Sequence, residues 1–337
     1  MQATEHDLDL ATTDLGPLAW VLEELRKSLA AASAALRRYV RDTGLARGAD
    51  MASVDEGQLR IARQQLHQAV GALEMVGQAG PAHMLRAMEA AAQKFIERPE
   101  LCTEASAAKV ERAGFALADY LEVLLLGKPA SAVALFPQYK DAQDLAGADR
   151  VHPADLWGLE WDWQEPEGPA AQETLDYAPA VRSRVDTAVL RLMKSGDTEA
   201  ARDVAQVSLG LAGSQTARQP RVLWQVCAGF FEAMALKLLP LDIYVKRAAT
   251  RVLLQYAALA KGEPGVSDRL VHDLVFFCAQ AVPAQSAQAP SLQAVRRAWR
   301  LERHPAVDYA TPQFGRFDPA LLAQARKRIT ATKDAWS

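Results

Sequence analysis

The sequence predicts an all-α protein made of two antiparallel helical bundles. Apolar residues recur at spacings of three and four, alanine and leucine dominate, and the alternating β-branched runs typical of strands are absent. Short turns such as Gly80-Pro81 separate the apolar stretches, and short connections favour antiparallel neighbours. A chain of 337 residues is also long enough for two domains.

The first bundle is expected over residues 1–148. Its apolar stretches predict helices at about residues 17–42, 56–78, 81–97, 104–127 and 131–146. Asp55 and Thr103 stand directly before two of these stretches, where a side-chain oxygen accepts a hydrogen bond from the first-turn backbone. Both are therefore predicted to be N-caps.

Residues 149–172 differ in composition from the helical stretches on either side. Trp157, Trp161 and Trp163 stand there among prolines and acidic residues. Proline and acid density favours an irregular connector, and the tryptophans favour one that is packed on a domain surface. A partner-docking strip is the alternative, because aromatic anchors are also typical of interfaces.

A second bundle is expected over residues 173–337. Helical spacing predicts helices at about residues 177–195, 197–213, 219–239, 241–262, 266–281, 291–302 and 318–334. No capping glycine follows the last of these, so the chain is expected to be a piece of a longer protein.

The two halves show a weak internal match. Sliding the chain against itself by 139 residues places Gly71 on Gly210 and His67 on Gln206. An amide thus stands where the first half has an imidazole. The second bundle is therefore predicted to be a degenerate copy of the first.

Composition excludes several classes of function. A net charge of −3 gives no reason to expect nucleic acid or an anionic membrane surface as a partner. The strongest apolar stretch, residues 113–126, is interrupted by Asp119 and Glu122, which favours a buried helix and argues against membrane insertion. The first fifteen residues are acidic and polar, unlike a signal peptide.

The sequence also lacks the patterns that hold metals and nucleotides. Histidine and cysteine pairs at ligand spacing are missing, as are glycine-rich phosphate loops, so we expect no metal, no cofactor and no ATP-binding kinase core. Three widely spaced cysteines, Cys102, Cys227 and Cys278, are predicted to be reduced core thiols, as in a cytoplasmic protein.

The most informative residue is His67. On a helical wheel it lies roughly 100° from the centre of the apolar stripe, at the boundary between core and water. Gly71 lies one turn further along the same boundary, although glycine inside a helix costs about 1 kcal/mol relative to alanine. Its missing side chain gives clearance for a phosphoryl group or a partner surface. A half-exposed imidazole that titrates near neutrality can act as a nucleophile toward phosphorus.

His67-x-x-x-Gly71, followed by a small, apolar half-helix, resembles the phosphoacceptor helix of histidine phosphotransfer (Hpt) domains. The chain also resembles, over essentially all 337 residues but more weakly in its second half, the N-terminal region of ChpA/PilL-type hybrid histidine kinases, which control type IV pili and twitching motility by chemotaxis-like two-component signalling. Five segments in the first half carry this resemblance. They are residues 19–22, 35–40, 63–71, 99–103 and 134–139. The resemblance implies a cytoplasmic phosphorelay module with response regulator receiver domains and a downstream kinase domain as partners.

One position departs from the Hpt pattern. Active Hpt helices usually carry a lysine three residues after the histidine, where this chain has Val70. A cation there would neutralise charge during phosphoryl transfer. Arg60 and Arg63, one to two turns upstream, are candidates to substitute for it, whereas Glu74 would oppose transfer.

Two functions therefore stay open. In the first, His67 is the phosphoacceptor, Gly71 gives clearance, and Arg60 and Arg63 supply positive charge. In the second, the chain is a non-catalytic scaffold that docks signalling or pilus-regulatory proteins, as the related FimL-type pilus regulators do. His67 favours the first function, and Val70 favours the second.

Overall fold

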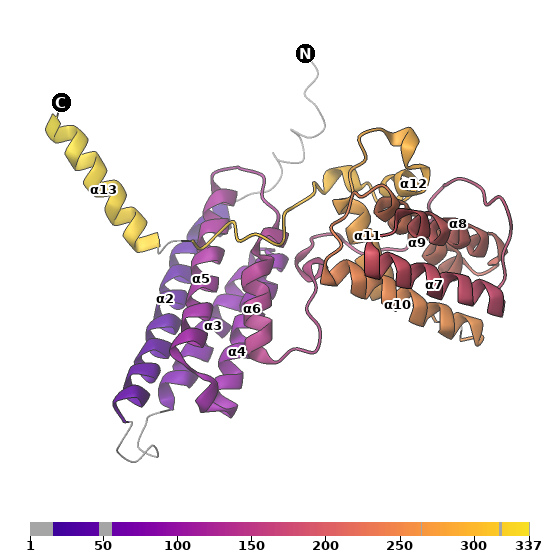
Figure 1. Ribbon diagram of the computed structural model, residues 1–337. Helices are drawn as coiled ribbons and strands as arrows, with labels where there is room; N and C mark the ends of the chain where they lie inside the picture. Colours follow the sequence, from indigo (N-terminus) through magenta and orange to yellow (C-terminus); the bar gives the residue numbers. More distant parts are fainter. Residues whose placement is uncertain (1–15, 47–55, 264, 317–318, 337) are drawn as a thin grey trace. The chain divides into compact units, whose positions relative to one another are not determined.

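The computed structural model describes residues 16–46, 56–263, 265–316 and 319–336. Throughout these ranges the secondary structure consists of helices and turns without strands, which confirms the all-α prediction (Figure 1). The chain forms two compact units: residues 1–158 with 308–337, and residues 159–307. The acidic N-terminal residues and the predicted N-cap Asp55 lie outside the described residues.

The first unit is a bundle of five helices within the described residues, apart from the C-terminal helix α13 (Pro319–Trp336). The five are α2 (Gly16–Leu45), α3 (Gly57–Met75), α4 (Ala79–Glu97), α5 (Glu104–Leu125) and α6 (Phe136–Ala146). Helix α3 packs between α2 and α4, α2 also packs on α5, and α6 packs on α4 and α5. Arg26 pairs with Glu122 and Arg37 with Glu111, so α2 and α5 run antiparallel.

Local sequence explains how α5 begins. The Thr103 hydroxyl accepts a hydrogen bond from the Ser106 amide at 3.2 Å, and Ser106 Oγ accepts one from the Thr103 amide at 2.8 Å. This reciprocal capping box satisfies two backbone donors that a helix start otherwise leaves open. The prediction of Thr103 as an N-cap is confirmed.

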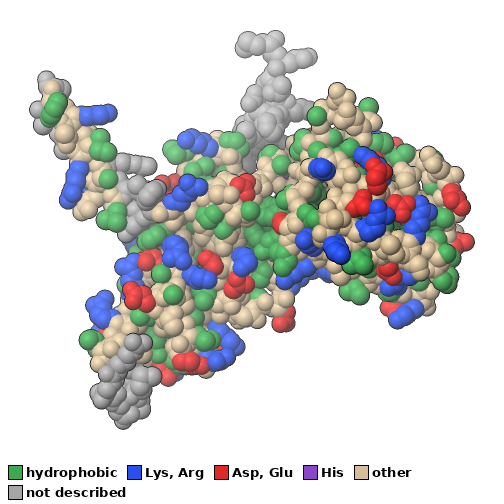
Figure 2. All heavy atoms as spheres, viewed as in Figure 1, with side chains coloured by type: hydrophobic (Ala, Val, Ile, Leu, Met, Phe, Trp, Pro, Cys, Tyr) green, Lys and Arg blue, Asp and Glu red, His purple; other side chains and the backbone are tan. Residues whose placement is uncertain are grey.

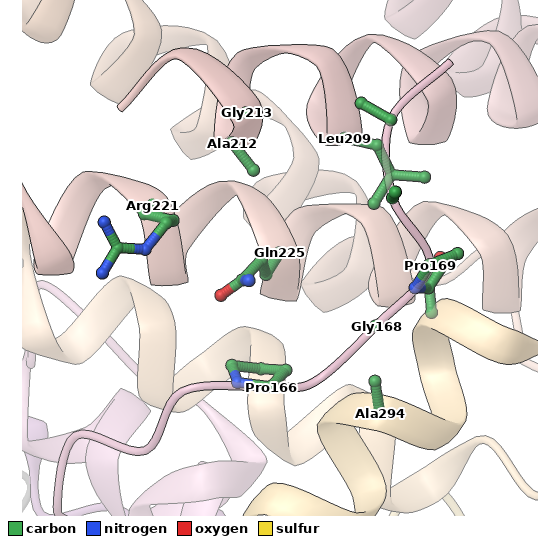
Figure 3. A pocket seen from close by; sticks show the side chains of 12 residues that line it. Pro166, Gly168, Pro169, Leu209, Ala212, Gly213, Arg221, Gln225 and Ala294 are labelled. Carbon is green, nitrogen blue, oxygen red and sulfur yellow. The ribbon is translucent and has the colours of Figure 1, made fainter. Parts of the chain in front are cut away.

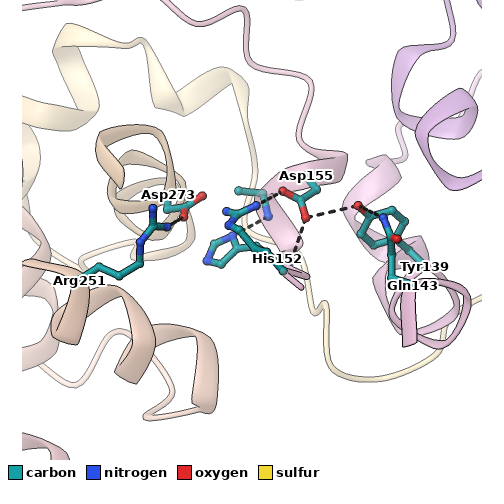
Figure 4. A network of polar contacts seen from close by, with 8 residues as sticks. Tyr139, Gln143, His152, Asp155, Arg251 and Asp273 are labelled. Carbon is teal, nitrogen blue, oxygen red and sulfur yellow. Dashed lines mark hydrogen bonds and ion pairs between the residues drawn. The ribbon is translucent and has the colours of Figure 1, made fainter. Parts of the chain in front are cut away.

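A buried polar network closes the first unit beyond α6. Tyr139 donates a hydrogen bond to Asp155 Oδ2 at 3.3 Å, and Arg150 pairs with the same carboxylate at 2.5 Å (Figure 4). Burial, followed by the charge of Asp155, raises the pKa of Tyr139 to about 12. His152 Nδ1 accepts a hydrogen bond from the Ala154 amide at 3.1 Å. This histidine therefore caps the short 3-10 helix Pro153–Leu156 that precedes Trp157.

Residues 308–316 return to the first unit. The Phe314 ring meets Tyr120 edge-on at 5.7 Å, and its carbonyl accepts a hydrogen bond from Gln138 at 2.9 Å. The Gly315 amide donates to Asp119 Oδ2 at 3.0 Å. This segment therefore covers α5 and α6.

The second unit is also a helical bundle. Its helices are α7 (Pro179–Ser195), α8 (Thr198–Ser214), α9 (Arg218–Ala235), α10 (Ile243–Ala260), α11 (Asp268–Gln280) and α12 (Pro290–Ala298). Arg251 on α10 donates to the buried Asp273 of α11 at 2.9 Å (Figure 4). Cys227 and Cys278 are free thiols in the core, and burial raises the pKa of both.

The two units share an order of packing. In the first unit, α3 packs on α2 and α4, α2 packs on α5, and α6 packs on α4 and α5. In the second unit, α8 packs on α7 and α9, α7 packs on α10, and α11 packs on α9 and α10. Helix α9 begins at 218 and α4 at 79, a separation of 139 positions, and α10 and α5 begin at 243 and 104, the same separation. The starts of the other three pairs are separated by other intervals, for example 141 positions between α3 and α8, so the predicted duplication agrees with the order of packing and with two of the five helix starts.

The tryptophans at the start of the second unit pack onto its helices. The Trp161 ring stacks on Trp299 with centroids 6.0 Å apart, and Trp163 Nε1 donates to Asp268 Oδ1 at 2.8 Å. Trp161 also meets the His272 ring edge-on at 5.5 Å. These side chains are engaged within their own unit.

The apolar stretch at residues 113–126 falls largely within α5 and contributes to the buried core. Among the described residues, every helix is too short or too polar to cross a membrane. Lys and Arg side chains alternate with Asp and Glu on the visible face, without a large patch of one sign (Figure 2).

Candidate functional site

His67 lies in the middle of α3, and its side chain is 71% exposed. The stripe of apolar residues in this helix is buried as the sequence predicts: Leu59, Ala62, Leu66, Ala69, Val70 and Leu73. His67 thus stands on the outer side of the helix, with its imidazole reaching the neighbouring helix α4.

The partner of the imidazole is Glu89. Glu89 Oε1 lies 3.1 Å from His67 Nδ1, and the Glu89 side chain is only 16% exposed. A carboxylate accepts hydrogen bonds, so Nδ1 is the atom that donates in this pair. When the ring is neutral, this arrangement leaves the lone pair on the other ring nitrogen, Nε2.

Sequence reasoning missed Glu89, because nothing in its own helix marks it. A signal was nevertheless present in the turn between α3 and α4. Residues 67 and 89 each lie eleven positions from residue 78, where that turn falls. In an antiparallel helical hairpin, residues equidistant from the turn lie side by side. The pair Glu74–Arg86 follows the same rule about residue 80.

The predicted supporting residues have different surroundings. Arg63 Nη2 lies 3.5 Å from Glu89 Oε1, so Arg63 and His67 share one carboxylate. Arg60 lies a turn further away, with its guanidinium 3.9 Å from Glu56. A Cβ atom added at Gly71 would meet nothing within 4 Å, as the clearance hypothesis requires.

Val70 does not stand beside the imidazole on the surface. It is 6% exposed and belongs to the core of the first unit. A lysine at this position would have to bend its chain out of the core to bring its ammonium to a phosphoryl group. Position 70 is therefore a packed core position and not a surface position beside the imidazole.

The corresponding place in the second unit is arranged differently. Gln206 is exposed on α8, as His67 is on α3. Gly210, however, is buried, and a Cβ there would lie 2.7 Å from Leu175 Cγ and 2.8 Å from the Glu173 carbonyl oxygen. The surface that is open at Gly71 is closed at Gly210 by the chain's own residues.

Two other histidines among the described residues have different surroundings. His83 is exposed on α4, and His304 is half-buried, which lowers its pKa. Within the described ranges, histidine, cysteine, aspartate and glutamate side chains form no cluster of three or more that could hold a metal ion.

The fold and the site define a helical-bundle protein with an exposed imidazole–carboxylate pair on one helical hairpin. Residues 170–311 match the sequence model of a family described as the second domain of the FimL scaffold protein. That match covers less than half of the chain and lies mostly in the second unit. This segment is therefore similar to FimL-type proteins. Neither curated proteins nor solved structures gave a match.

Proposed function

We propose that the first unit is a histidine phosphotransfer module and that the second unit is a docking scaffold. The observation that carries the first part is the pairing of His67 Nδ1 with Glu89 Oε1 at 3.1 Å beside the open surface at Gly71. This geometry leaves one nitrogen free on an accessible imidazole, which is what a phosphoacceptor requires.

The proposed chemistry is transfer from an aspartyl phosphate of a receiver domain. The His67 Nε2 lone pair attacks phosphorus, the bond from phosphorus to the aspartate oxygen breaks, and the aspartate leaves as a carboxylate. The imidazole becomes cationic during the attack, and Glu89 stabilises the proton that stays on Nδ1. The reverse reaction returns the phosphoryl group, so the unit passes phosphate in either direction.

The scaffold role of the second unit is supported by the match of residues 170–311 to the FimL scaffold family. The resemblance of the chain to pilus-controlling proteins extends this role to type IV pilus regulation in the cytoplasm. The proposed partners are receiver domains, a kinase domain of the same longer protein and pilus-regulatory scaffold proteins. Gln206 fits a docking role, because an amide forms no stable phosphoryl adduct.

A scaffold role for the whole chain is the second candidate. Val70 is the observation that favours it, because its place in the core leaves no lysine beside His67. In this case both units dock partners, and His67 is only a surface residue.

Phosphate labelling separates the two candidates. The purified chain is incubated with labelled, phosphorylated receiver domain and then washed at high pH, where phosphohistidine is stable. The phosphotransfer role predicts an alkali-stable, acid-labile label that His67→Gln abolishes. His83→Gln is the matched control, because His83 is also exposed on the same helical hairpin and should leave the label unchanged.

Two results would contradict the proposed role of His67. If cognate donors leave no label on the wild-type chain, the scaffold candidate stands for both units. If the label survives His67→Gln, the acceptor is another residue.

A further inference from the structure

The second unit holds a segment of its own chain against α8. The Leu175 amide donates a hydrogen bond to the Gly210 carbonyl at 3.0 Å, and the Leu175 side chain occupies the space that the absent Gly210 side chain leaves. Ala171 and Thr174 approach Gly213 in the next turn, within 3.9 Å of an added Cβ. A non-helical segment with a leucine thus fits this helix at its glycines.

The same segment continues over a cavity. Residues 166–171 cross α8 and α9 above a cavity of about 230 Å³, whose wall includes Leu209 and Ala212 (Figure 3). Glu165 anchors its beginning, since its carboxylate lies 2.5 Å from Arg221 Nε. The segment is therefore held at both ends, by an arginine–carboxylate pair and by the leucine on Gly210.

The corresponding helix in the first unit presents an open surface. Gly71 has the place in α3 that Gly210 has in α8, on an offset of 139 positions that also separates the ends of these two helices, at residues 75 and 214. No described atom fills the space beside it. In the second unit, the surface of the helix at Gly210 is thus covered by the chain's own segment. In the first unit, no described atom covers the surface at Gly71.

Charge favours an acidic occupant. The segment at residues 164–178 contains four acidic residues and no lysine or arginine. Arg60 and Arg63 on α3 are 67% and 47% exposed, and their ion pairs are long, at 3.9 and 3.5 Å. These arginines can exchange their present partners for the carboxylates of a docked segment.

We propose that the surface of α3 at Gly71 binds a non-helical, acidic segment of a partner protein through a leucine side chain. The leucine packs on Gly71 as Leu175 packs on Gly210, and carboxylates further along the segment face Arg63 and Arg60, which lie eight and eleven residues before Gly71 in α3. This docking needs no phosphoryl transfer, so it holds for either proposed function.

A synthetic peptide tests the proposal. The probe is a fluorescent peptide with the sequence of residues 169–176, Pro-Ala-Ala-Gln-Glu-Thr-Leu-Asp, added to the whole chain and followed by fluorescence anisotropy. We expect saturable binding that weakens as salt increases. Replacing the peptide's leucine by aspartate should weaken binding by about tenfold or more, because the apolar contact is lost.

Two glycine variants locate the binding surface. Gly71→Leu should abolish binding, because the new side chain fills the space for the peptide's leucine. Gly44→Leu is the matched control, since Gly44 also lies in a helix of the first unit with nothing within 4 Å, and it should bind as the wild type does. Circular dichroism confirms that both variants keep their helices.

Two results would overturn the proposal. The first is absence of binding to the wild-type chain. The second is binding that survives Gly71→Leu, which would place the peptide on α8 by exchange with the chain's own segment. Peptide binding is measured without a phosphodonor and the phosphate label is measured without peptide, so this proposal and the phosphotransfer proposal fail independently.

Discussion

At the scale of single residues, the site depends on one carboxylate that orients one imidazole. Glu89 is mostly buried, whereas His67 is exposed, so we expect the packed carboxylate to position the exposed ring. A phosphoacceptor gains from this, because the ring is held in one tautomer before the donor arrives.

Glu89→Gln should therefore slow phosphoryl transfer without unfolding the bundle. A hydrogen bond to a charged group contributes about 1.5–3 kcal/mol, which corresponds to roughly ten- to hundredfold in rate. Stopped-flow transfer rates measure the loss, and ¹⁵N NMR of the histidine ring measures the tautomer. An unchanged rate together with an unchanged tautomer would show that Glu89 has no positioning role.

Val70→Lys tests whether position 70 is tightly packed in the core. Val70 is 6% exposed, so a lysine there should lower the free energy of unfolding by about 1–3 kcal/mol. Urea denaturation measures the cost, and Val70→Ile is the control for a change of volume alone. If the lysine variant is as stable as the wild type, the lysine side chain at position 70 reaches the solvent without disturbing the core.

Helical periodicity was sufficient to predict the exposure of His67 and the burial of the stripe beside it. Periodicity within one helix carries no information about the facing helix, and Glu89 was therefore missed. The position of Glu89 follows from the α3–α4 hairpin, because residues 67 and 89 are equally far from the turn between these helices. The burial of Val70 did follow from the periodicity, which placed Val70 in the apolar stripe.

At the scale of elements, two helical glycines have opposite surroundings. A methyl group at Gly71 meets open space, whereas one at Gly210 collides with Leu175 and the Glu173 carbonyl. Gly71→Ala should raise the free energy of unfolding by up to about 1 kcal/mol, through helix propensity. Gly210→Ala should lower it by about 1–3 kcal/mol, through overpacking.

Paired thermal or urea denaturation of the two alanine variants checks this difference. Equal effects at both positions would contradict the proposed closure of the α8 surface. Faster proteolysis near residues 173–175 in Gly210→Ala would show directly that the segment has moved.

Helix α12 gives a prediction for pH. Glu232 Oε2 accepts the Leu292 amide at 2.7 Å in the first turn of α12, but burial is the larger influence and raises the pKa of Glu232. The unfolded chain then releases this proton at lower pH than the folded chain does. This contribution to stability is therefore fully present below the ordinary pKa of about 4.3 and is lost as pH rises through the raised value.

Comparison of wild type with Glu232→Gln isolates this contribution. The wild type should lose stability relative to the glutamine variant as pH rises above about 4.3, measured by urea unfolding at a series of pH values. A difference between the two proteins that stays constant over this range would contradict a raised pKa.

At the scale of the whole molecule, the chain combines two similar bundles with different surfaces. The sequence predicted the helical class and an offset of 139 residues, because both depend on local spacing. The return of residues 308–316 to α5 and α6 was not predicted, since it depends on contacts such as Gly315 with Asp119 that are far apart in sequence. The closure of Gly210 by Leu175 was missed for the same reason.

The division of roles between the units is the central claim. The open surface with an imidazole lies in the first unit, and the closed surface with an amide lies in the second, which is mostly the part similar to the FimL scaffold family. We therefore propose phosphoryl transfer for the first unit and docking for the second.

The most direct test is NMR of the full chain labelled with ¹⁵N-histidine, recorded before and after addition of phosphorylated receiver domain at alkaline pH. The account predicts that His67 alone gains a phosphorus coupling, at Nε2, while Nδ1 stays protonated and paired with Glu89. Unchanged histidine signals in the presence of an active phosphodonor would contradict it.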